Sequence, residues 1–250
     1  MERGLYAAAT GMLAQQAMQD VLAQNIANAG TVGYKQDAPT FRAVQGMALQ
    51  RLNDGHGRGA RIGDLGTGVK SDKVYIDWRS GPLTHTGNPL DAALRDGQFF
   101  AIQTPQGERY TRAGDLQLNA SGQLITAKGL PVLGVDNRPI TAPTTGILSL
   151  DPAGNLNADG NAIAKLKIVT VDPAQIVKEG DTLFRALTPA SVRLAAAPQL
   201  QTGTLEQSNM DTVQGLVKLI TVSRGFDMAQ RAVTTQDELL SKAASEIGKL

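Results

Sequence analysis

Side chains that could perform acid–base, nucleophilic or metal chemistry are few in this sequence. There are two histidines, His56 and His85, and no cysteine. The lack of cysteine removes thiolate nucleophiles, thiolate metal sites and disulfides together. Both histidines lie in turn-like surroundings, where a surface position is expected. The carboxylates of Asp91 and Asp96 have no evident partner for acid–base work. These residues predict no catalytic site.

Two glycine-containing stretches come close to known ligand loops without matching them. Residues 63–71 (GDLGTGVKS) differ from a phosphate-binding loop by the inserted Val69, which displaces the lysine, and neither a preceding buried strand nor a following helix is expected. Residues 155–160 (NLNADG) resemble the start of a calcium loop, but its twelfth position would be Leu166 instead of glutamate. Two β-turns are expected there instead. We therefore expect no cofactor, no metal ion and no small-molecule substrate.

The charge distribution gives no sign of a nucleic-acid partner. The formal net charge is +1, acidic and basic residues are interspersed, and only 4% of residues are aromatic. A nucleic-acid surface needs a broad basic field or stacking aromatic side chains. The N-terminus also lacks the continuous apolar run of a cleavable signal peptide, and no stretch approaches the 18 apolar residues of a membrane span.

The C-terminal stretch, residues 209–250, has the pattern of a long helix with a narrow apolar seam. Apolar residues recur at two positions of a seven-residue repeat, which indicates packing against another helix. At 1.5 Å per residue this helix would be about 60 Å long, too long to be covered by a compact globule of this size. Ser208 precedes Asp211 at capping-box spacing, which predicts a helix start there. The predicted seam consists of Leu219, Val222, Phe226, Ala229, Val233, Leu240 and Ile247.

The N-terminal stretch, residues 3–29, is also predicted to be a helix. Apolar residues at near-heptad spacing and short alanines would permit close helix packing, and Gly30 and Gly33 would end the helix. Its predicted seam consists of Leu5, Met12, Leu22 and Ile26.

Strand and turn signals fill the middle of the chain. All 11 prolines lie between Pro39 and Pro198, and short runs of alternating or β-branched residues recur there between turns. The predicted fold is α+β: long N- and C-terminal helices paired as a coiled coil, with a central antiparallel β-rich domain. We expect an N-terminal helix in residues 1–35, a transitional extended segment in 36–84, a β-domain in 85–204 and a C-terminal helix in 205–250.

Residues 97–122 are expected to be structural. If they begin with a strand, Phe99 and Phe100 point to opposite faces, one into the β-core and the other toward a neighbouring element or subunit. Tyr110 and Arg112 share a face, and Arg112 can donate a planar fork to a carboxylate or to carbonyls of the adjoining turn. An anion pocket at Arg112 is the open alternative.

Three blocks of the chain resemble the axial proteins of the bacterial flagellum, specifically the basal-body rod family. The first is residues 25–35 (NIANAGTVGYK), and the last is the entry into the C-terminal helix at 205–209 (LEQSN). The central block runs from residue 88 to residue 124. The matching positions include Asn25, Asn28, Thr31, Gly33, Tyr34, Gly97, Phe99, Phe100, Tyr110, Thr111, Arg112 and Gly114.

This resemblance implies a non-catalytic structural subunit. Copies of the chain would assemble with other axial proteins of the rod and hook into a tubular drive shaft around the export channel, and the shaft would transmit torque. The resemblance also implies export by the flagellar type III apparatus, without a cleaved signal peptide, to the basal body. Chain length favours a rod protein over the longer hook and hook-associated proteins. The opening residues 2–6 (ERGLY) resemble the proximal-rod type, which we favour, and residues 66–69 (GTGV) resemble the distal-rod type, which stays the alternative. Two alternatives remain: a secreted binding module with a β-head on a helical stalk, and an enzyme with a site in the β-domain.

Overall fold

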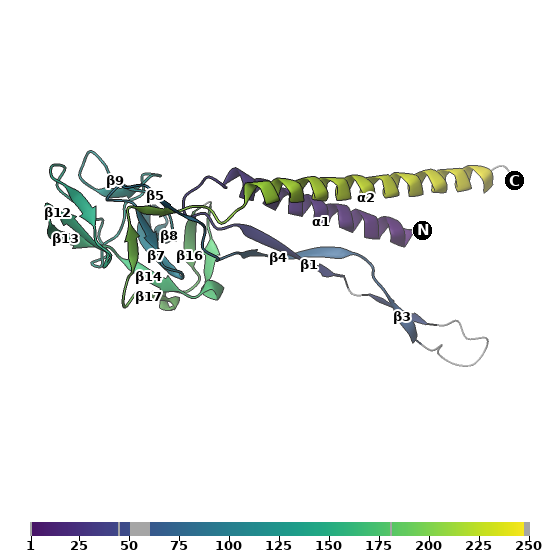
Figure 1. Cartoon of the computed structure of the whole chain (residues 1–250). Coiled ribbons are helices and arrows are strands. Elements are labelled where there is room, and N and C mark those ends of the chain that lie inside the picture. The colour runs from purple at the N-terminus through teal and green to yellow at the C-terminus, as the bar shows by residue number, and fades with distance from the viewer. Residues whose placement is uncertain (1, 45, 51–60, 181, 248–250) are drawn as a thin grey trace. The chain divides into compact units, whose positions relative to one another are not determined.

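The computed structural model of the chain describes residues 2–44, 46–50, 61–180 and 182–247. It divides into two compact units (Figure 1), each described here by itself. The helical unit comprises Met1–Ile26, Asp37–Tyr75 and Thr212–Leu250, and the β-unit comprises Ala27–Gln36 and Ile76–Asp211. The predicted α+β class, with a helix at each end of the chain and a β-rich middle, is confirmed.

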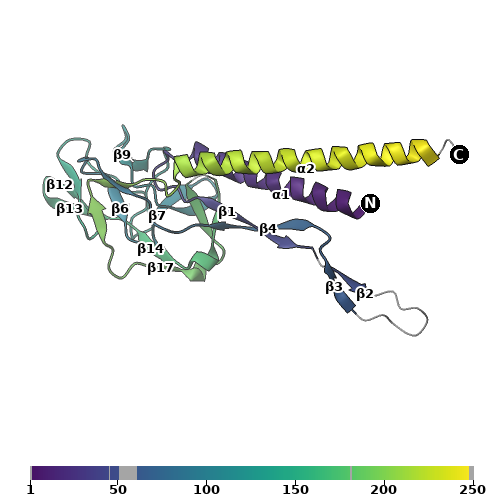
Figure 2. The ribbon, with the colours of Figure 1, turned by 45° about the vertical axis from the view of Figure 1, so that its right-hand side comes forward.

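Two helices, α1 (Glu2–Ala27) and α2 (Thr212–Ile247), lie side by side in the helical unit (Figure 2). A Cβ built on Gly4 would lie 2.7 Å from the Gln236 amide, and one built on Gly225 would lie 3.1 Å from the Gln15 amide. Moving eleven residues forward along α1 therefore means moving eleven residues back along α2. The two helices are antiparallel, and small residues at these positions allow their close approach.

The exposure of α2 follows the predicted seven-residue repeat. Within the described side chains, the seam positions from Leu219 to Leu240 are half-buried, whereas Val217, Ile220 and Met228 on other faces are exposed. The side chain of Ile247 lies outside the described residues. On α1, Leu22 is buried, Met12 and Ile26 are half-buried, and Leu5 is exposed.

The prediction that Ser208 starts the C-terminal helix is wrong. Helix α2 begins four residues later, at Thr212. Ser208 is buried, and its hydroxyl accepts a hydrogen bond from the Met210 N–H at 3.2 Å. The serine therefore stabilises the turn before the helix, and the capping-box spacing is coincidental.

A narrow two-stranded ribbon completes the helical unit. Strands β1 (Asp37–Ala43) and β4 (Val69–Ile76) pair with each other, as do β2 (Met47–Gln50) and β3 (Arg61–Leu65). Asn25 joins α1 to this ribbon: its amide donates to the Asp37 carbonyl and accepts from the Asp37 N–H, both at 2.8 Å. Residues 63–71 span the end of β3 and the start of β4, and no helix follows them, so the phosphate-loop geometry is absent from this described stretch. His56 lies outside the described residues.

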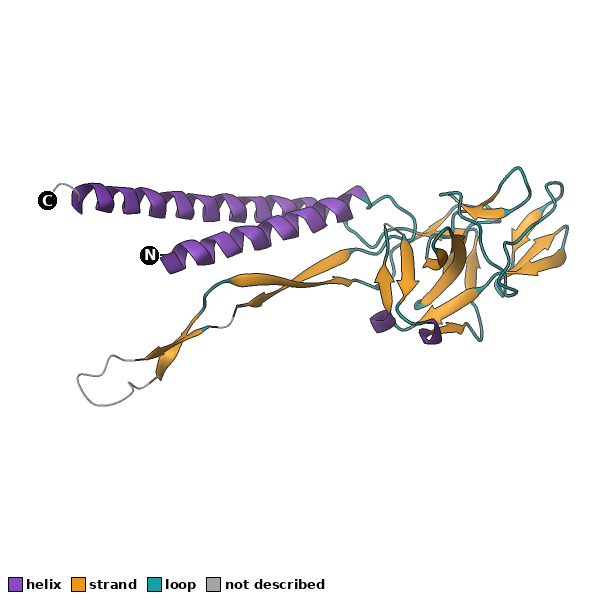
Figure 3. Ribbon diagram, turned by 180° about the vertical axis from the view of Figure 1, so that it is seen from behind, coloured by secondary structure: helices purple, strands orange, loops and turns teal. Residues whose placement is uncertain are grey.

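The β-unit is built around a six-stranded antiparallel sheet (Figure 3), in the order β15-β16-β8-β7-β14-β17. The bounds of these strands are β7 (Gln98–Thr104), β8 (Gly107–Thr111), β14 (Ile168–Val171), β15 (Ile176–Lys178), β16 (Leu183–Ala186) and β17 (Val192–Leu194). Two short 3₁₀ turns, η1 (Pro173–Gln175) and η2 (Pro189–Ser191), connect strands of this sheet.

Smaller antiparallel ladders surround the main sheet. They consist of β5 (Leu83–His85) with β19 (Thr204–Glu206), β6 (Ala92–Leu94) with β18 (Leu200–Thr202), β9 (Leu116–Leu118) with β10 (Leu124–Thr126), and β11 (Leu148–Leu150), β12 (Asn155–Ala158) and β13 (Asn161–Lys165). The residues that resemble a calcium loop form β12 and its turn, because Asp159 and Gly160 both adopt positive φ and reverse the chain into β13.

Phe99 and Phe100 lie on opposite faces of β7, as predicted. Phe100 belongs to one buried apolar cluster, with Leu124, Leu156 and Ile168, and Phe99 belongs to a second. In the second cluster, the rings of Phe99 and Phe184 both pack against Trp78, at 5.6 and 5.2 Å between centroids. Trp78 comes from the segment between β4 and β5, so the second face meets a neighbouring element of the same chain.

The antiparallel register of α1 and α2 can be tested by crosslinking, because the chain has no native cysteine. We expect a short thiol-reactive crosslinker to join Gln15→Cys to Gly225→Cys. The control pair, Gln15→Cys with Gln236→Cys, is displaced by eleven residues, about 16 Å along the helix, and should not react. Mobility on a denaturing gel reports the result. Equal crosslinking of both pairs would contradict the register.

Candidate functional site

Three segments that are far apart in the sequence meet inside the β-unit. They are residues 33–36 after α1, residues 112–114 after β8, and residues 205–209 before α2. The Gly33 N–H donates to the carbonyl of Glu206 at 2.8 Å, and the Gln36 N–H donates to the Asn209 side chain at 2.8 Å. We call this meeting point the junction. It fastens the segment leaving the first helix to the segment entering the last one.

Glycines allow the junction backbones to touch. Gly33 has φ of 69°, and a Cβ on it would lie 2.5 Å from the Arg112 carbonyl carbon. A Cβ on Gly114 would lie 1.7 Å from the Ala92 carbonyl oxygen. Real Cβ atoms do not approach backbone so closely, so any other residue at Gly33 or Gly114 would force the segments apart.

A buried ion cluster lies at the centre of the junction. The Lys35 ammonium contacts Glu206 Oε1 at 2.7 Å, and the Arg112 guanidinium contacts Glu206 Oε2 at 2.7 Å. Their side chains are 0%, 2% and 1% exposed for Lys35, Arg112 and Glu206. Ions this deeply buried are stable only when they are paired and hydrogen-bonded. We call Lys35, Arg112 and Glu206 the junction cluster.

All five N–H groups of Arg112 are occupied within the chain. Nε and Nη2 donate to Glu206, Nη2 also donates to the Leu94 carbonyl at 3.1 Å, and Nη1 donates to the carbonyls of Arg95 and Gln98 at 3.2 and 3.1 Å. Arginine has no further donors. The fork thus binds both a carboxylate and the adjoining turn, and the alternative of an anion pocket at Arg112 is excluded.

The charges of the junction cluster do not cancel, since two cations share one carboxylate. Desolvation, followed by repulsion from Arg112, lowers the pKa of Lys35 below its usual 10.5, although the hydrogen bond and the charge of Glu206 act in the opposite direction. Lys35 also donates to the Arg79 carbonyl at 2.8 Å, and the Gly81 N–H donates to Glu206 Oε1 at 3.1 Å. Glu206 therefore joins its own segment to three others, at Lys35, Gly81 and Arg112.

Asn209 and Asp77 extend the junction toward the segment before β5. The Asn209 amide donates to the carbonyls of Asp77 and Arg79 at 2.8 and 3.0 Å, and Gln36 donates to the Asp77 carboxylate at 2.9 Å. A hydrogen bond from Arg79 holds the pKa of Asp77 at about 2. The Asp77 carboxylate therefore remains ionised, and accepts from Gln36 and Arg79, at any pH well above that value.

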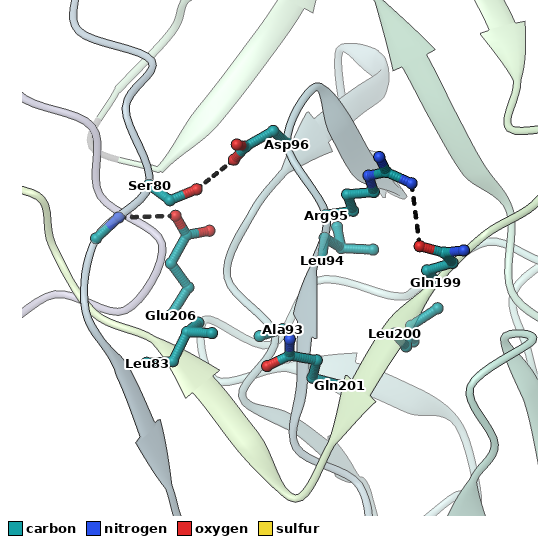
Figure 4. Close-up of a pocket in the computed structure, with 11 residues that line it drawn as sticks. Ser80, Leu83, Ala93, Leu94, Arg95, Asp96, Gln199, Leu200, Gln201 and Glu206 are labelled. Atoms are coloured by element: carbon teal, nitrogen blue, oxygen red, sulfur yellow. Dashed lines mark hydrogen bonds between the residues drawn. The ribbon is translucent and has the colours of Figure 1, made fainter.

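A hollow of about 450 Å³ opens beside the junction cluster (Figure 4). Leu83, Leu94 and Leu200 line it, Glu206 reaches it from one side, and Asp96 accepts a hydrogen bond from Ser80 at its edge. Arg95 donates to Gln199 across the opposite wall at 3.1 Å. Ser80 thus pairs with Asp96, and Arg95 pairs with Gln199, at the edges of the hollow.

The structure brings part of the predicted motif together. Gly33, Tyr34 and Arg112 lie in the junction, where Lys178 places its ammonium 3.9 Å from the Tyr34 ring centroid and donates to the Lys35 carbonyl. Tyr110, Thr111 and Phe99 lie beside the junction in β8 and β7. Gly114 also lies in the junction, whereas Asn28, Thr31, Gly97 and Phe100 shape turns of the β-unit or fill its core. Asn25 instead holds α1 to the ribbon of the helical unit.

Sequence reasoning missed Lys35, Glu206 and Asn209 as site residues. Each lies within a motif block that the sequence singled out, and Lys35 and Glu206 carry opposite charges. The signal that could have found the pair is that Lys35 and Glu206 are each the one charged residue of their motif block, on either side of the β-domain. Their separation of 171 residues hid the pairing.

The three segments that meet in the junction each contain residues that match a model of a known protein family. Three family models match in order: flagella basal body rod protein at residues 5–35, flagellar hook protein FlgE/F/G D1 domain at 93–177, and flagellar basal body rod FlgEFG protein C-terminal at 201–246. Lys35, Arg112 and Glu206 fall in one matched segment each. The junction cluster therefore connects all three.

Individual relatives match along their whole length. The basal-body rod protein FlgG of Bacillus subtilis is 32% identical, over 97% of this chain and 98% of its own. The basal-body rod protein FlgF of Caulobacter vibrioides is 30% identical over all of both chains, as is the hook-basal body complex protein FlhO of Bacillus subtilis. This chain belongs to the flagellar basal-body rod protein family. Within that family it is of the FlgF or FlgG type.

Membership makes the chain a structural subunit of the flagellar basal body and not an enzyme. Within the described residues, no group of three or more histidine, aspartate or glutamate side chains could hold a metal ion. Neither α1 nor α2, over the part that the structure describes, is apolar enough along its length to cross a membrane.

Removing the charge of Glu206 should lower the free energy of unfolding more than removing the charge of Lys35. Glu206→Gln leaves two buried cations without a counter-ion and should lower the free energy of unfolding by about 3–5 kcal/mol. Lys35→Met leaves the Arg112–Glu206 pair intact and should cost less, by at least about 1 kcal/mol. Urea unfolding followed by the fluorescence of Trp78 gives both values. Equal costs, or a larger cost for Lys35→Met, would refute the role of Glu206 as the shared anion.

The difference in unfolding free energy between the native sequence and Lys35→Met should depend on pH. Because the pKa of Lys35 is lowered on folding, the unfolded chain binds more protons between that pKa and 10.5. Unfolding free energy of the native sequence should therefore rise with pH in this window relative to that of Lys35→Met.

Proposed function

We propose that this chain is a subunit of the tubular rod in which α1 and α2 pair as a coiled coil in the inner core and the β-unit packs outside. The rod would surround the export channel and transmit torque. Family membership supports the rod assignment, and the antiparallel contacts of α1 with α2 support the pairing. The half-buried positions of α2 from Leu219 to Leu240 recur with the period of a coiled-coil seam.

The observation that carries this proposal is the junction. A torque-bearing subunit needs its two terminal helices fastened to one folded body, because a flexible connection would rotate without transmitting force. The segment after α1 and the segment before α2 are held by the same buried carboxylate, Glu206, in the β-unit. Mutually bonded backbones and buried ions resist separation far better than a loop would.

Each part of the chain is proposed to have its own structural role in the rod. Residues 1–35 and 205–250 supply the helical core, residues 36–84 supply an extended contact segment, and residues 85–204 supply the β-domain. The partners are other copies of this chain, other axial proteins of the rod and hook, and the flagellar type III export apparatus. The chain is proposed to cross the cytoplasmic membrane through that apparatus without a cleaved signal peptide, and to take the proximal-rod, FlgF-type position.

A charge placed in the α2 seam should block assembly. Val233 is half-buried, and Val233→Asp would desolvate a carboxylate without a partner in each copy, at a cost of several kcal/mol. The matched control is Thr235→Asp, because Thr235 is exposed two residues away on the same helix. We expect Val233→Asp to be secreted but absent from purified basal bodies, with motility lost, and Thr235→Asp to be incorporated. Normal rods built from Val233→Asp would show that the seam is not the assembly surface.

A further inference from the structure

A second, smaller hollow of about 110 Å³ lies in the β-unit under the loop that follows α1. Thr31 and Val32 form one wall of it, and Asp115 reaches it from the segment between β8 and β9. Its remaining polar lining consists of Thr111, Thr126, Lys128 and Thr182. No residue of the junction cluster lines this hollow, and no step of the proposed function uses it.

Asp115 differs from the carboxylate beside it. Asp91 and Asp115 form an isolated antiparallel bridge, and Asp91 is satisfied by Thr86 at 2.6 Å and Asn88 at 2.9 Å. The Oδ1 atom of Asp115 is buried, yet no group in the described part of the chain donates a hydrogen bond to it. A buried acceptor left without a donor lowers stability, and in native proteins such an atom calls for a specific explanation.

The local charge favours a cation. Asp115 and Lys128 both line the hollow, and the carboxylate of Asp91 lies close enough to Asp115 to repel it. Burial raises the pKa of Asp115, with repulsion from Asp91 as a further cause. A hydrogen bond from its own backbone N–H and the attraction of Lys128 lower the pKa and compensate only in part. An additional positive group would keep the carboxylate ionised.

The threonine hydroxyls complete a set of acceptors. Thr111 Oγ1 accepts the Ala113 N–H at 3.1 Å, and Thr126 Oγ1 accepts the Leu130 N–H at 3.3 Å. Each hydroxyl oxygen has a second lone pair. Together with Asp115 Oδ1, these oxygens suit a compact group that carries several N–H donors and no acceptor. The volume of about 110 Å³ admits the end of one side chain.

We propose that this hollow receives the ammonium or guanidinium group of a basic side chain from a neighbouring rod subunit, with Asp115 as its counter-ion. This inference rests on the proposed packing of the chain into a rod. The isolated subunit then holds a carboxylate that is only partly compensated, and the neighbour completes its neutralisation on assembly. Asp115 would lower the stability of the free chain and raise that of the rod, so one substitution should change the two in opposite directions.

The test is Asp115→Asn in the full chain, with Asp91→Asn as the matched control. At neutral pH, Asp115→Asn should raise the melting temperature of the purified subunit by about 2–4 °C. Because the pKa of Asp115 is raised on folding, this gain should vanish below the unfolded pKa of 3.8 and grow as pH rises through the folded pKa. Asp91→Asn should lower the melting temperature, since Asp91 has partners within the chain.

In cells, Asp115→Asn should reduce the amount of this chain in purified basal bodies by at least about tenfold, because the neighbour's cation would be left buried and unpaired. Incorporation equal to that of the native sequence would overturn the cation site. A lower melting temperature for Asp115→Asn would also overturn it, because a donor within the chain, such as Lys128, would then be the partner.

Melting temperatures in different salts distinguish a free cation bound in the hollow from a side chain of a neighbouring subunit. If potassium or ammonium chloride raised the melting temperature of the subunit above that in tetramethylammonium chloride at equal ionic strength, and Asp115→Asn removed the difference, the ligand would be a small cation and the neighbouring side chain would be excluded. Absence of the native chain from purified basal bodies would instead refute the proposed function, which keeps the two failures distinct.

Discussion

A single desolvated carboxylate, Glu206, organises this molecule. It binds Lys35 from 171 residues away in the sequence and Arg112 from 94 residues away, and all three side chains are almost completely buried. Neither cation could be buried alone, because the cost of removing an ion from water exceeds what packing returns. The segment that follows the first helix, the central sheet and the segment that precedes the last helix are therefore interdependent.

The backbone around this carboxylate explains the glycines of the motif blocks. At Gly33 and at Gly114, two backbone segments of the chain lie so close together that no Cβ could fit between them. Gly33 also adopts positive φ. Arg112 occupies all its donors within the chain, so the most prominent basic residue of the central block is a structural crosslink. In this member of the basal-body rod family, the arginine of the central block therefore joins segments of the β-unit to one another and does not bind a ligand.

The sequence predicted those features that depend on local periodicity. Helix α2 and its repeat from Leu219 to Leu240 follow from residues three and four apart, and β7 and β8 follow from alternation and turn residues. The start of α2 was predicted wrongly because Ser208 and Asp211 have the spacing of a capping box, whereas the Ser208 hydroxyl accepts the Met210 N–H in a local turn that precedes the helix. The hairpin of β12 and β13 was missed because its strands are short and polar, and periodicity carries little information over four or five residues. Pairing of Lys35 with Glu206 could not be predicted, since nothing local in either block identifies its partner.

Hydrogen exchange at single amides tests the central claim, that these segments close as one unit around Glu206. The Gly33 N–H bonds to the Glu206 carbonyl, the Gly81 N–H bonds to the Glu206 carboxylate, and the Gln207 N–H bonds to the Pro82 carbonyl. If the junction is one cooperative unit, these three amides should exchange with a common free energy of opening in the intact chain. Glu206→Gln should lower all three values by the same amount. Distinct opening energies for Gly33 and Gln207, or a change confined to Gly81, would show that the segments open independently and would contradict the account.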